Sequence, residues 1–227
     1  MSVPSSSARG WEPYAGLAYV VCFLASVLVS NPPADNSSDR KWIANYTGHS
    51  EQFRHLATGL LLLLAGLSLM TFLVALWRRI AAAHPAELPS RLPVAAAATA
   101  AALMGAGGMV MGYIPGGELI GRYPLPSVDL LRMSNDLGFA LAGVAGTWAA
   151  AVAVATLSVQ GHAAGVFGAR MRAAGIVTAL VLIFSILFIP IVALLAWVLT
   201  ATVMWIRRPT LADLGPVPGV QAEGVRP

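Results

Sequence analysis

The polar side chains that could do chemistry gather in two stretches, residues 31–55 and 114–136. Both stretches border apolar runs, and a carboxylic acid beside an apolar surface can act as a proton donor. Aromatic rings accompany the acids, and their faces can stabilise a carbocation. The candidate catalytic residues are therefore Asp136, Asp129 and Glu51, and the candidate substrate-binding residues are Trp42, Tyr46, His49, His55, Tyr113 and Tyr123.

This combination of an acid with an apolar, aromatic-lined cavity is what acid-initiated cyclisation of an isoprenoid chain requires. A lipid-modifying acid–base enzyme would need the same groups. Both interpretations require the carboxylates to meet on one cavity, so they make a geometric prediction that a structure can examine.

A structural interpretation of the same acids stands beside the catalytic one. Residues 134–136 could cap a helix that begins there, because a carboxylate suits the positive end of the helix dipole. Glu51 could pair with Arg54 or His55, and Arg132 could pair with Asp129 and Asp136, at spacings of three or four along a helix. In that case the carboxylates would face water or arginine rather than a substrate.

A metal site would have to use His49, Glu51 and His55, but their spacing does not form the His-Glu-x-x-His pattern of a helical zinc site. The sequence also lacks a P-loop, a dinucleotide-binding fingerprint, a Cys-x-x-Cys pair and a Gly-x-Ser-x-Gly elbow. We therefore expect neither a metal nor a cofactor.

The elements that must position these residues are membrane helices. Of the 227 residues, 57% are hydrophobic and 11% charged, whereas soluble domains carry roughly a quarter charged residues. A soluble enzyme, a nucleic-acid-binding domain and a disordered chain are excluded on this ground. The composition predicts an all-α, polytopic bundle of transmembrane helices.

The uncharged runs predict a single integral membrane domain over residues 1–227, with a flexible cytoplasmic tail at 209–227. The last run holds Pro190 near its middle, where a helix must kink or end. A turn there gives six spans, and a kink gives five. The six predicted spans are residues 13–31, 55–77, 93–114, 137–159, 173–188 and 190–206.

The distribution of basic residues favours six spans over five. Six spans place nine of the 14 Lys and Arg residues on the cytoplasmic side and five outside, whereas five spans place six inside and eight outside. Because cytoplasmic loops are enriched in Lys and Arg, both termini are expected to be cytoplasmic. The Arg- and Ala-rich composition is typical of a bacterium with GC-rich DNA, which predicts a bacterial inner membrane.

Small residues recur at helical spacing in two of the predicted spans. Gly138, Ala142, Gly146 and Ala150 follow one another at intervals of four, and Gly108 precedes Gly112 by the same interval. Such stripes let helix backbones approach closely in lipid. They predict packing within the bundle, with a homodimer face as the alternative.

The predicted outer loops contain three further local signals. Ser38 or Asp39 could begin a short helix on which Trp42, Ile43 and Tyr46 share one face, either as a helix in the membrane interface or as a lid over a pocket. Residues 114–117, Ile-Pro-Gly-Gly, predict a turn that closes the third span. Ser127 could begin a second short helix.

Several of these features together resemble a group of small actinobacterial membrane proteins of unknown function. The shared features are the Asn31-Pro-Pro-Ala-Asp35-Asn36 loop, Trp42-Ile-Ala-Asn-Tyr46, Gln52-Phe-Arg, Asn135-Asp136, and a final pair of short apolar segments about a proline, with Trp197 and an Arg-Arg stop. The resemblance covers about residues 11–208 and implies six helices. It implies no activity.

The sequence therefore predicts an integral cytoplasmic-membrane protein in an accessory role, whose outer loops contact lipid or a partner. The alternative is a membrane-embedded enzyme on an isoprenoid or lipid, such as an acid-initiated terpenoid cyclase. A small-molecule transporter is the third interpretation, and it is disfavoured because no Asp, Glu, Lys or Arg lies deep in a span. The expected partners are membrane lipids or a hydrophobic isoprenoid or lipid ligand, and no nucleic acid.

Overall fold

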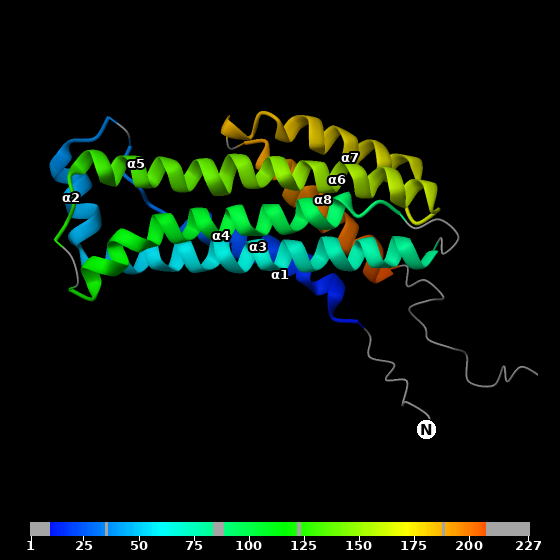
Figure 1. Ribbon diagram of the computed structural model, residues 1–227, viewed down its shortest axis with the longest axis horizontal. Helices are drawn as coiled ribbons and strands as arrows, with labels where there is room; N and C mark the ends of the chain where they lie inside the picture. Colours follow the sequence, from blue (N-terminus) through cyan, green and yellow to red (C-terminus); the bar gives the residue numbers. More distant parts are fainter. Residues whose placement is uncertain (1–9, 35, 84–88, 122–123, 188, 208–227) are drawn as a thin grey trace, which may run out of the picture.

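The computed structural model describes residues 10–34, 36–83, 89–121, 124–187 and 189–207. Within these ranges the chain is helical and contains no strand, which confirms the all-α prediction (Figure 1). The elements are α1 (Glu12–Val29), α2 (Asp39–Thr47), α3 (His49–Ala83), α4 (Leu92–Leu119), α5 (Val128–Phe139), the π-helical turn η1 (Ala140–Ala145), α6 (Gly146–Ala163), α7 (Ala169–Leu182), the 3₁₀ turn η2 (Ser185–Leu187) and α8 (Ile191–Arg207).

Four helices in the described part of the chain are long and apolar enough to cross a membrane. They are α1, α3, α4 and the continuous rod of α5, η1 and α6, which runs from Val128 to Ala163. The last two helices are shorter, with 14 residues in α7 and 17 in α8. The structure therefore provides four candidate spans and does not establish the predicted six.

The chain folds back between α7 and α8, and the two helices pack against each other (Figure 1). Pro190 lies in this turn, directly before the first residue of α8. The five-span alternative, in which one long helix kinks at Pro190, does not match this arrangement. A proline suits this position because its ring and missing N–H are tolerated in the first turn of a helix.

Two of the predicted helix ends are wrong. Residues 114–117 do not form a turn, because α4 continues through Pro115 to Leu119. Pro115 is buried, and Gly112 and Gly116 beside it bring α4 against Leu56 of α3. Burial against α3 thus outweighs the hydrogen bond that a proline removes from a helix.

The second wrong helix end concerns residues 134–136, which cap nothing. The helix already begins at Val128, with Ser127 at its N-cap position, and passes through these residues without a break. The local Ser-Asn-Asp pattern was interpreted as a helix start because these residues favour caps. Here the helix extends beyond the apolar run because its first turns pack against α2 and α4.

The small-residue stripes pack helices of the same chain. A Cβ atom on Gly59 would lie 2.5 Å from the carbonyl oxygen of Gly108, so α3 and α4 cross in close contact. A Cβ atom on Gly107 would lie 2.5 Å from the carbonyl oxygen of Gly138, so α4 meets the α5 rod in the same way. This is the packing role that the spacing predicted.

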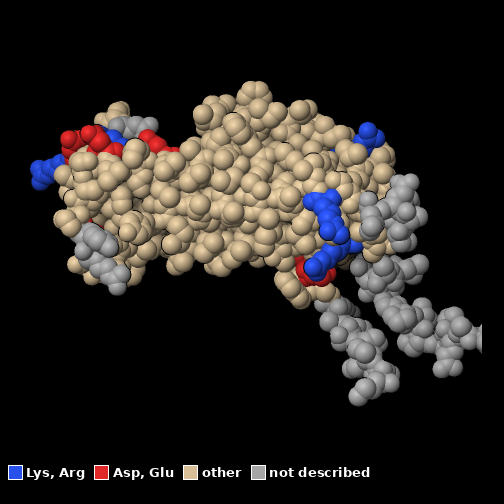
Figure 2. Space-filling model, in the orientation of Figure 1, with Lys and Arg blue, Asp and Glu red and all other residues tan. Residues whose placement is uncertain are grey.

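The helices pack differently in the two halves of the bundle. Around one half, α1 contacts α3 and α8, α8 contacts α7, α7 contacts α6, and α4 closes the ring between α6 and α3. The half that carries α2 lacks the α7–α8 hairpin (Figure 1). On the face drawn in Figure 2, charged side chains lie at both ends of the bundle, and the band between them is uncharged.

Candidate functional site

The short helix α2 forms a cap on one end of the bundle, where it contacts α3, α4 and α5. Trp42 and Tyr46 point beneath it and are 0% and 1% exposed. They pack with Leu131 of α5 in a small second core. These two candidate substrate-binding residues thus hold the cap in place, and Ile43 on the same helix is 41% exposed.

Polar contacts beneath the cap explain the position of His55. Its Nε2 atom lies 2.7 Å from Oδ1 of Asn45, and the Asn45 amide donates to the carbonyl of Asn31 at 3.1 Å. The ring of His55 lies 4.7 Å from that of Tyr46, measured between centroids. Gln52 donates to the carbonyl of Tyr46 at 2.9 Å. His55 is therefore part of the network that joins α2 to α3.

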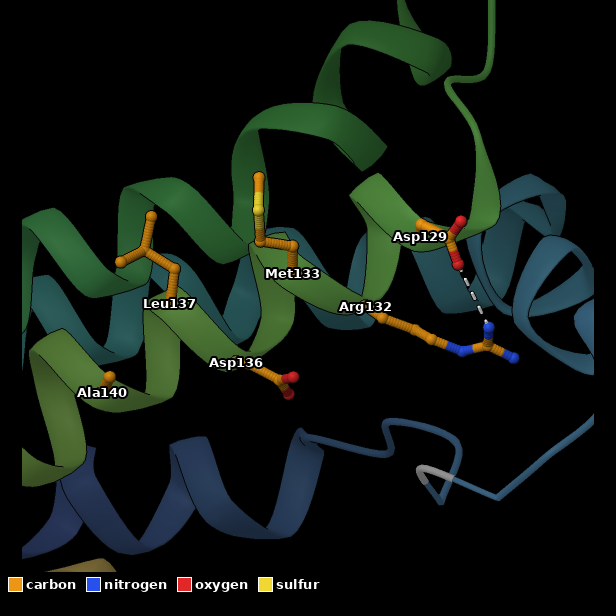
Figure 3. Close-up of a pocket in the computed structure, with 6 residues that line it drawn as sticks. All are labelled: Asp129, Arg132, Met133, Asp136, Leu137 and Ala140. Atoms are coloured by element: carbon orange, nitrogen blue, oxygen red, sulfur yellow. Dashed lines mark hydrogen bonds and ion pairs between the residues drawn. The ribbon is translucent and has the colours of Figure 1, made fainter.

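Two of the three candidate catalytic acids form ion pairs at the surface. Glu51 lies 3.2 Å from Arg54. Asp129 lies 3.5 Å from Arg132, and its side chain is 93% exposed (Figure 3). Arg132 also binds Asp39 of α2 at 2.9 Å, so it ties α5 to the cap. Asp129 and Asp136 line one pocket on the surface of the α5 rod (Figure 3), whereas Glu51 lines a different one beside Asn31 and Lys41, so the three acids do not share a single cavity.

The remaining candidates are also dispersed. His49 is exposed at the first residue of α3, and Tyr113 is 66% exposed on α4. Tyr123 lies outside the described residues. Within the described ranges, no group of three His, Cys, Asp or Glu residues could hold a metal ion.

Asp136 differs from the other acids because it heads a groove between helices. Its side chain points from α5 toward α1 (Figure 3), and it forms no hydrogen bond or ion pair with another described residue. Burial beneath the cap raises the pKa of the Tyr46 phenol to about 12, and the negative charge of the nearby Asp136 carboxylate contributes to this increase. The phenol of Tyr46 therefore stays protonated at neutral pH.

The groove below Asp136 has a volume of about 430 Å³. One wall is α1, the opposite wall is α5 with η1, and the floor is formed by α3 and α4. Its lining residues are Phe23, Ser26, Val27, Ser30, Pro32, Thr58, Leu62, Met111, Asn135, Asp136, Phe139, Ala142 and Gly143.

The lining changes from polar to apolar along the groove. The end nearest the cap carries Ser30, Thr58, Asn135 and Asp136. Their positions at this end follow from the helix directions, because α1 runs toward the cap and α3 and α5 run away from it. One helical turn further from the cap the lining is mainly apolar, with Phe23, Leu62, Phe139 and Ala142, and the hydroxyl of Ser26 there donates to the backbone carbonyl of Phe23. The groove thus has the polarity of an amphiphile, with a polar head and an apolar tail.

Two features of the groove lining are unusual. The Thr58 hydroxyl is buried without a hydrogen-bond partner among the described residues, and the Thr58 side chain is only 5% exposed. A buried polar atom without a partner costs roughly 1–3 kcal/mol, but the hydroxyl oxygen is itself shielded from the groove, so a ligand atom could reach it only after the side chain rotates. The wall at Ala142 and Gly143 is the π-helical turn η1, and such turns occur frequently at functional sites.

The groove residues other than Asp136 were not predicted from the sequence. Phe23, Thr58 and Phe139 come from three different helices and carry no motif. The one available signal was Asn135-Asp136, and it was interpreted as a helix cap or as part of a larger acidic cluster.

The chain matches no protein-family model, no curated protein and no solved structure. The likeness to small actinobacterial membrane proteins stays an expectation from the sequence.

Proposed function

We propose that this chain is an integral membrane protein that binds the apolar tail of a lipid or isoprenoid in the groove between α1 and α5, with the polar head at Asp136. It acts as an accessory or lipid-presenting protein of a bacterial cytoplasmic membrane. The single observation that carries the proposal is the groove itself, which is mainly apolar at one end and polar at the other, where Asp136 has no ion-pair partner among the described residues.

The depth of the groove in a bilayer supports this proposal. In α3, the uncharged stretch from Arg54 to Arg78 is about 36 Å long, and the rod from Asp136 to His162 is about 39 Å long, at about 1.5 Å per residue. Both lengths exceed the thickness of a hydrocarbon core, which is about 30 Å. The polar end of the groove then lies at the headgroup level of one leaflet, and its apolar end lies among the acyl chains.

The occupant follows from where the groove opens. Val27 at its rim is 37% exposed, and the gap between α1 and the α5 rod faces the side of the bundle, where lipid tails surround a membrane protein. An empty apolar groove at that depth would forfeit its dispersion contacts, whereas a tail that enters it restores them. The volume lies within the range of about 300–1,000 Å³ that is typical of ligand sites.

The polar end indicates the kind of head that would fit. An ionised Asp136 carboxylate accepts hydrogen bonds and donates none, and the Asn135 side chain both donates and accepts them. A head that donates hydrogen bonds, as a hydroxyl or an ammonium does, would therefore be bound better than a purely anionic one.

The predicted sidedness agrees with this arrangement. The excess of basic residues on one side places both termini in the cytoplasm, and the cap with Asp136 then faces outward. The same orientation, with cytoplasmic termini and an outward-facing cap, results from six spans and also from four spans with an α7–α8 hairpin that returns to the side from which it starts.

Photo-crosslinking tests the proposal directly. The purified chain would be reconstituted into vesicles of phosphatidylethanolamine and phosphatidylglycerol that contain phosphatidylethanolamine with a diazirine in one acyl chain. We expect adducts to concentrate on groove residues such as Phe23, Val27 and Met111. Leu60 and Leu64 of α3 are 57% and 50% exposed and serve as internal controls for general contact with lipid. Equal labelling of both groups, measured by peptide mass spectrometry, would contradict the proposal.

A second candidate function is acid-initiated isoprenoid cyclisation, favoured by one observation: Asp136 heads a groove that Phe23 and Phe139 line. The Asp136 carboxylic acid would protonate an epoxide oxygen of the substrate, and the C–O bond would break as a neighbouring alkene π pair forms a C–C bond. The final cation would return a proton to the Asp136 carboxylate, so the product is an isomer of the substrate. Aromatic rings would stabilise the cation.

This second candidate predicts a product that depends on one residue. Membranes containing the chain would be incubated with an epoxidised polyprenyl substrate, and the products analysed by mass spectrometry. The cyclase predicts an isomer of unchanged mass from the natural chain and at least about a hundredfold less from Asp136→Asn, which cannot donate the proton. The absence of an isomer from the natural chain would reject this candidate and leave the lipid-binding proposal intact.

A further inference from the structure

The α7–α8 hairpin ends in a turn that is apolar on its exposed surface. Five large side chains at this turn are exposed, namely Ile183, Phe184, Ile186, Leu187 and Ile189, at 55%, 62%, 67%, 66% and 78%. Ser185 is fully buried. Turns that reach water are normally rich in Gly, Asn, Asp and Ser, so this surface is typical of contact with hydrocarbon.

A hydrogen bond fixes the depth of the turn along the bundle. Nε1 of Trp148 in α6 donates to the carbonyl of Ile183 at 3.2 Å. On the continuous rod, Trp148 lies about 18 Å from Asp136 and about 21 Å from His162. The turn therefore lies about midway between the two polar ends of the bundle.

The helix lengths lead to the same depth. Arg172 near the start of α7 is exposed, and about 21 Å of helical rise separates it from Ile186. The return along α8 from Ile191 to Arg207 is about 24 Å. Both distances fall short of the hydrocarbon core of about 30 Å. A hairpin that starts at one face of the membrane would end inside it.

The backbone of the turn is suited to an apolar environment. Unpaired N–H groups are very costly in lipid, and irregular backbone is tolerated there only when its polar groups find partners. The N–H groups of Ile183, Phe184, Leu187 and Ile189 all donate to carbonyls within the hairpin. Pro190 has no N–H, and η2 also contacts η1.

We infer that α7 and α8 form a re-entrant hairpin that enters and leaves the bilayer at one face, with its turn embedded in hydrocarbon near the midplane. The chain then has four full spans, and both termini lie on one side, so the charge distribution that favoured six spans is equally satisfied. Because the hairpin stops at the midplane, α8 fills the space between α1 and α7 in one leaflet only. The groove occupies the corresponding space in the other leaflet.

Site-directed labelling tests this topology independently of lipid binding in the groove. Single cysteines would be placed in a Cys22→Ser background at the turn (Ile186→Cys), at the cap end (His49→Cys) and at the start of the hairpin (Arg172→Cys). Intact spheroplasts and inverted vesicles would be treated with a membrane-impermeant maleimide. We expect the two control cysteines to react from opposite sides, and the cysteine at 186 to react from neither side until SDS dissolves the membrane.

Each other outcome overturns the inference. Labelling of position 186 from the same side as position 49 would show a full crossing and hence six spans. Labelling from the same side as position 172 would show that the hairpin lies outside the bilayer.

A cysteine at position 186 could fail to react because its local surroundings block the maleimide. A measurement of its depth in the bilayer distinguishes that case from burial in hydrocarbon. A nitroxide at position 186 should be relaxed by oxygen and protected from a water-soluble nickel chelate to a greater degree than a nitroxide at position 177. Val177 is 58% exposed and lies nearer the start of α7. Equal or shallower depth at 186 would contradict a turn at the midplane.

Discussion

Gly59→Ala and Gly108→Ala are each expected to lower the melting temperature of the purified chain by roughly 5–10 °C, a larger effect than any surface substitution. A Cβ atom on Gly59 would lie 2.5 Å from the carbonyl oxygen of Gly108, and one on Gly108 would lie 2.6 Å from the carbonyl oxygen of Gly59. The obstacle is backbone on both sides, so no side chain can rotate away.

The α3–α4 crossing would have to widen to accommodate either methyl group. Overpacking of this kind costs about 2–3 kcal/mol, and for a chain of this size each kcal/mol corresponds to roughly 2–4 °C. The crossing also supports the groove, because Thr58 and Leu62 on its floor flank Gly59 in α3. Thermal unfolding in detergent, followed by tryptophan fluorescence, measures the shift.

Gly168→Ala is the matched control. No atom lies within 4 Å of the position that its Cβ would occupy, and its φ of −73° is ordinary for an alanine. Its melting temperature should therefore stay within about 2 °C of the natural chain, since surface substitutions usually change stability by under about 0.5 kcal/mol. If Gly59→Ala behaved like Gly168→Ala, the close crossing of α3 and α4 would be wrong.

The packing of the spans was predictable because it depends on local spacing. Small residues four apart lie on one helix face, and in lipid that face becomes a helix contact. Gly108 and Gly138 therefore took the roles that their spacing predicted. The identity of the partner helix was not predictable, since it depends on the order of the helices in space.

The helix ends were less predictable where tertiary contacts outweigh local preferences. Pro115 and Asp136 both occupy helix interiors, although proline and the Ser-Asn-Asp pattern favour helix ends. Burial against α3 carries α4 through Pro115, and packing against α2 and α4 extends the α5 rod beyond the apolar run. The number of spans could not be decided from charge for a different reason: a hairpin that turns back inside the bilayer and a hairpin that crosses it leave the basic residues on the same sides.

The candidate site was predictable only at Asp136. A pattern of aromatic residues near acids is equally consistent with a small core beneath a cap and with a ligand pocket. Trp42 and Tyr46 belong to such a core. The groove takes single residues from α1, α3, α4 and α5, so no stretch of sequence contains its pattern. The turn η1 that shapes one wall also lacks a sequence signal, because its residues, Ala140–Ala145, are ordinary helix formers and glycine.

Val27→Trp is expected to reduce photo-crosslinking of the lipid probe to Met111 and Phe139 by more than about tenfold. Val27 lines the groove at its open side. An indole there would occupy the space of the lipid tail and restore the apolar contacts that the tail supplies. A loss of about 1.4 kcal/mol in binding free energy corresponds to a tenfold loss in affinity, and the exclusion of a tail from a groove should exceed that.

Leu28→Trp provides the matched control, because it adds the same side chain one residue further along α1. Leu28 is 85% exposed and does not line the groove, so its indole would lie among the surrounding lipids. This variant should keep the natural labelling of Met111 and Phe139, and both variants should melt near the natural temperature. Equal labelling in Val27→Trp and Leu28→Trp would mean that the tail does not occupy the groove, because only the first substitution fills it.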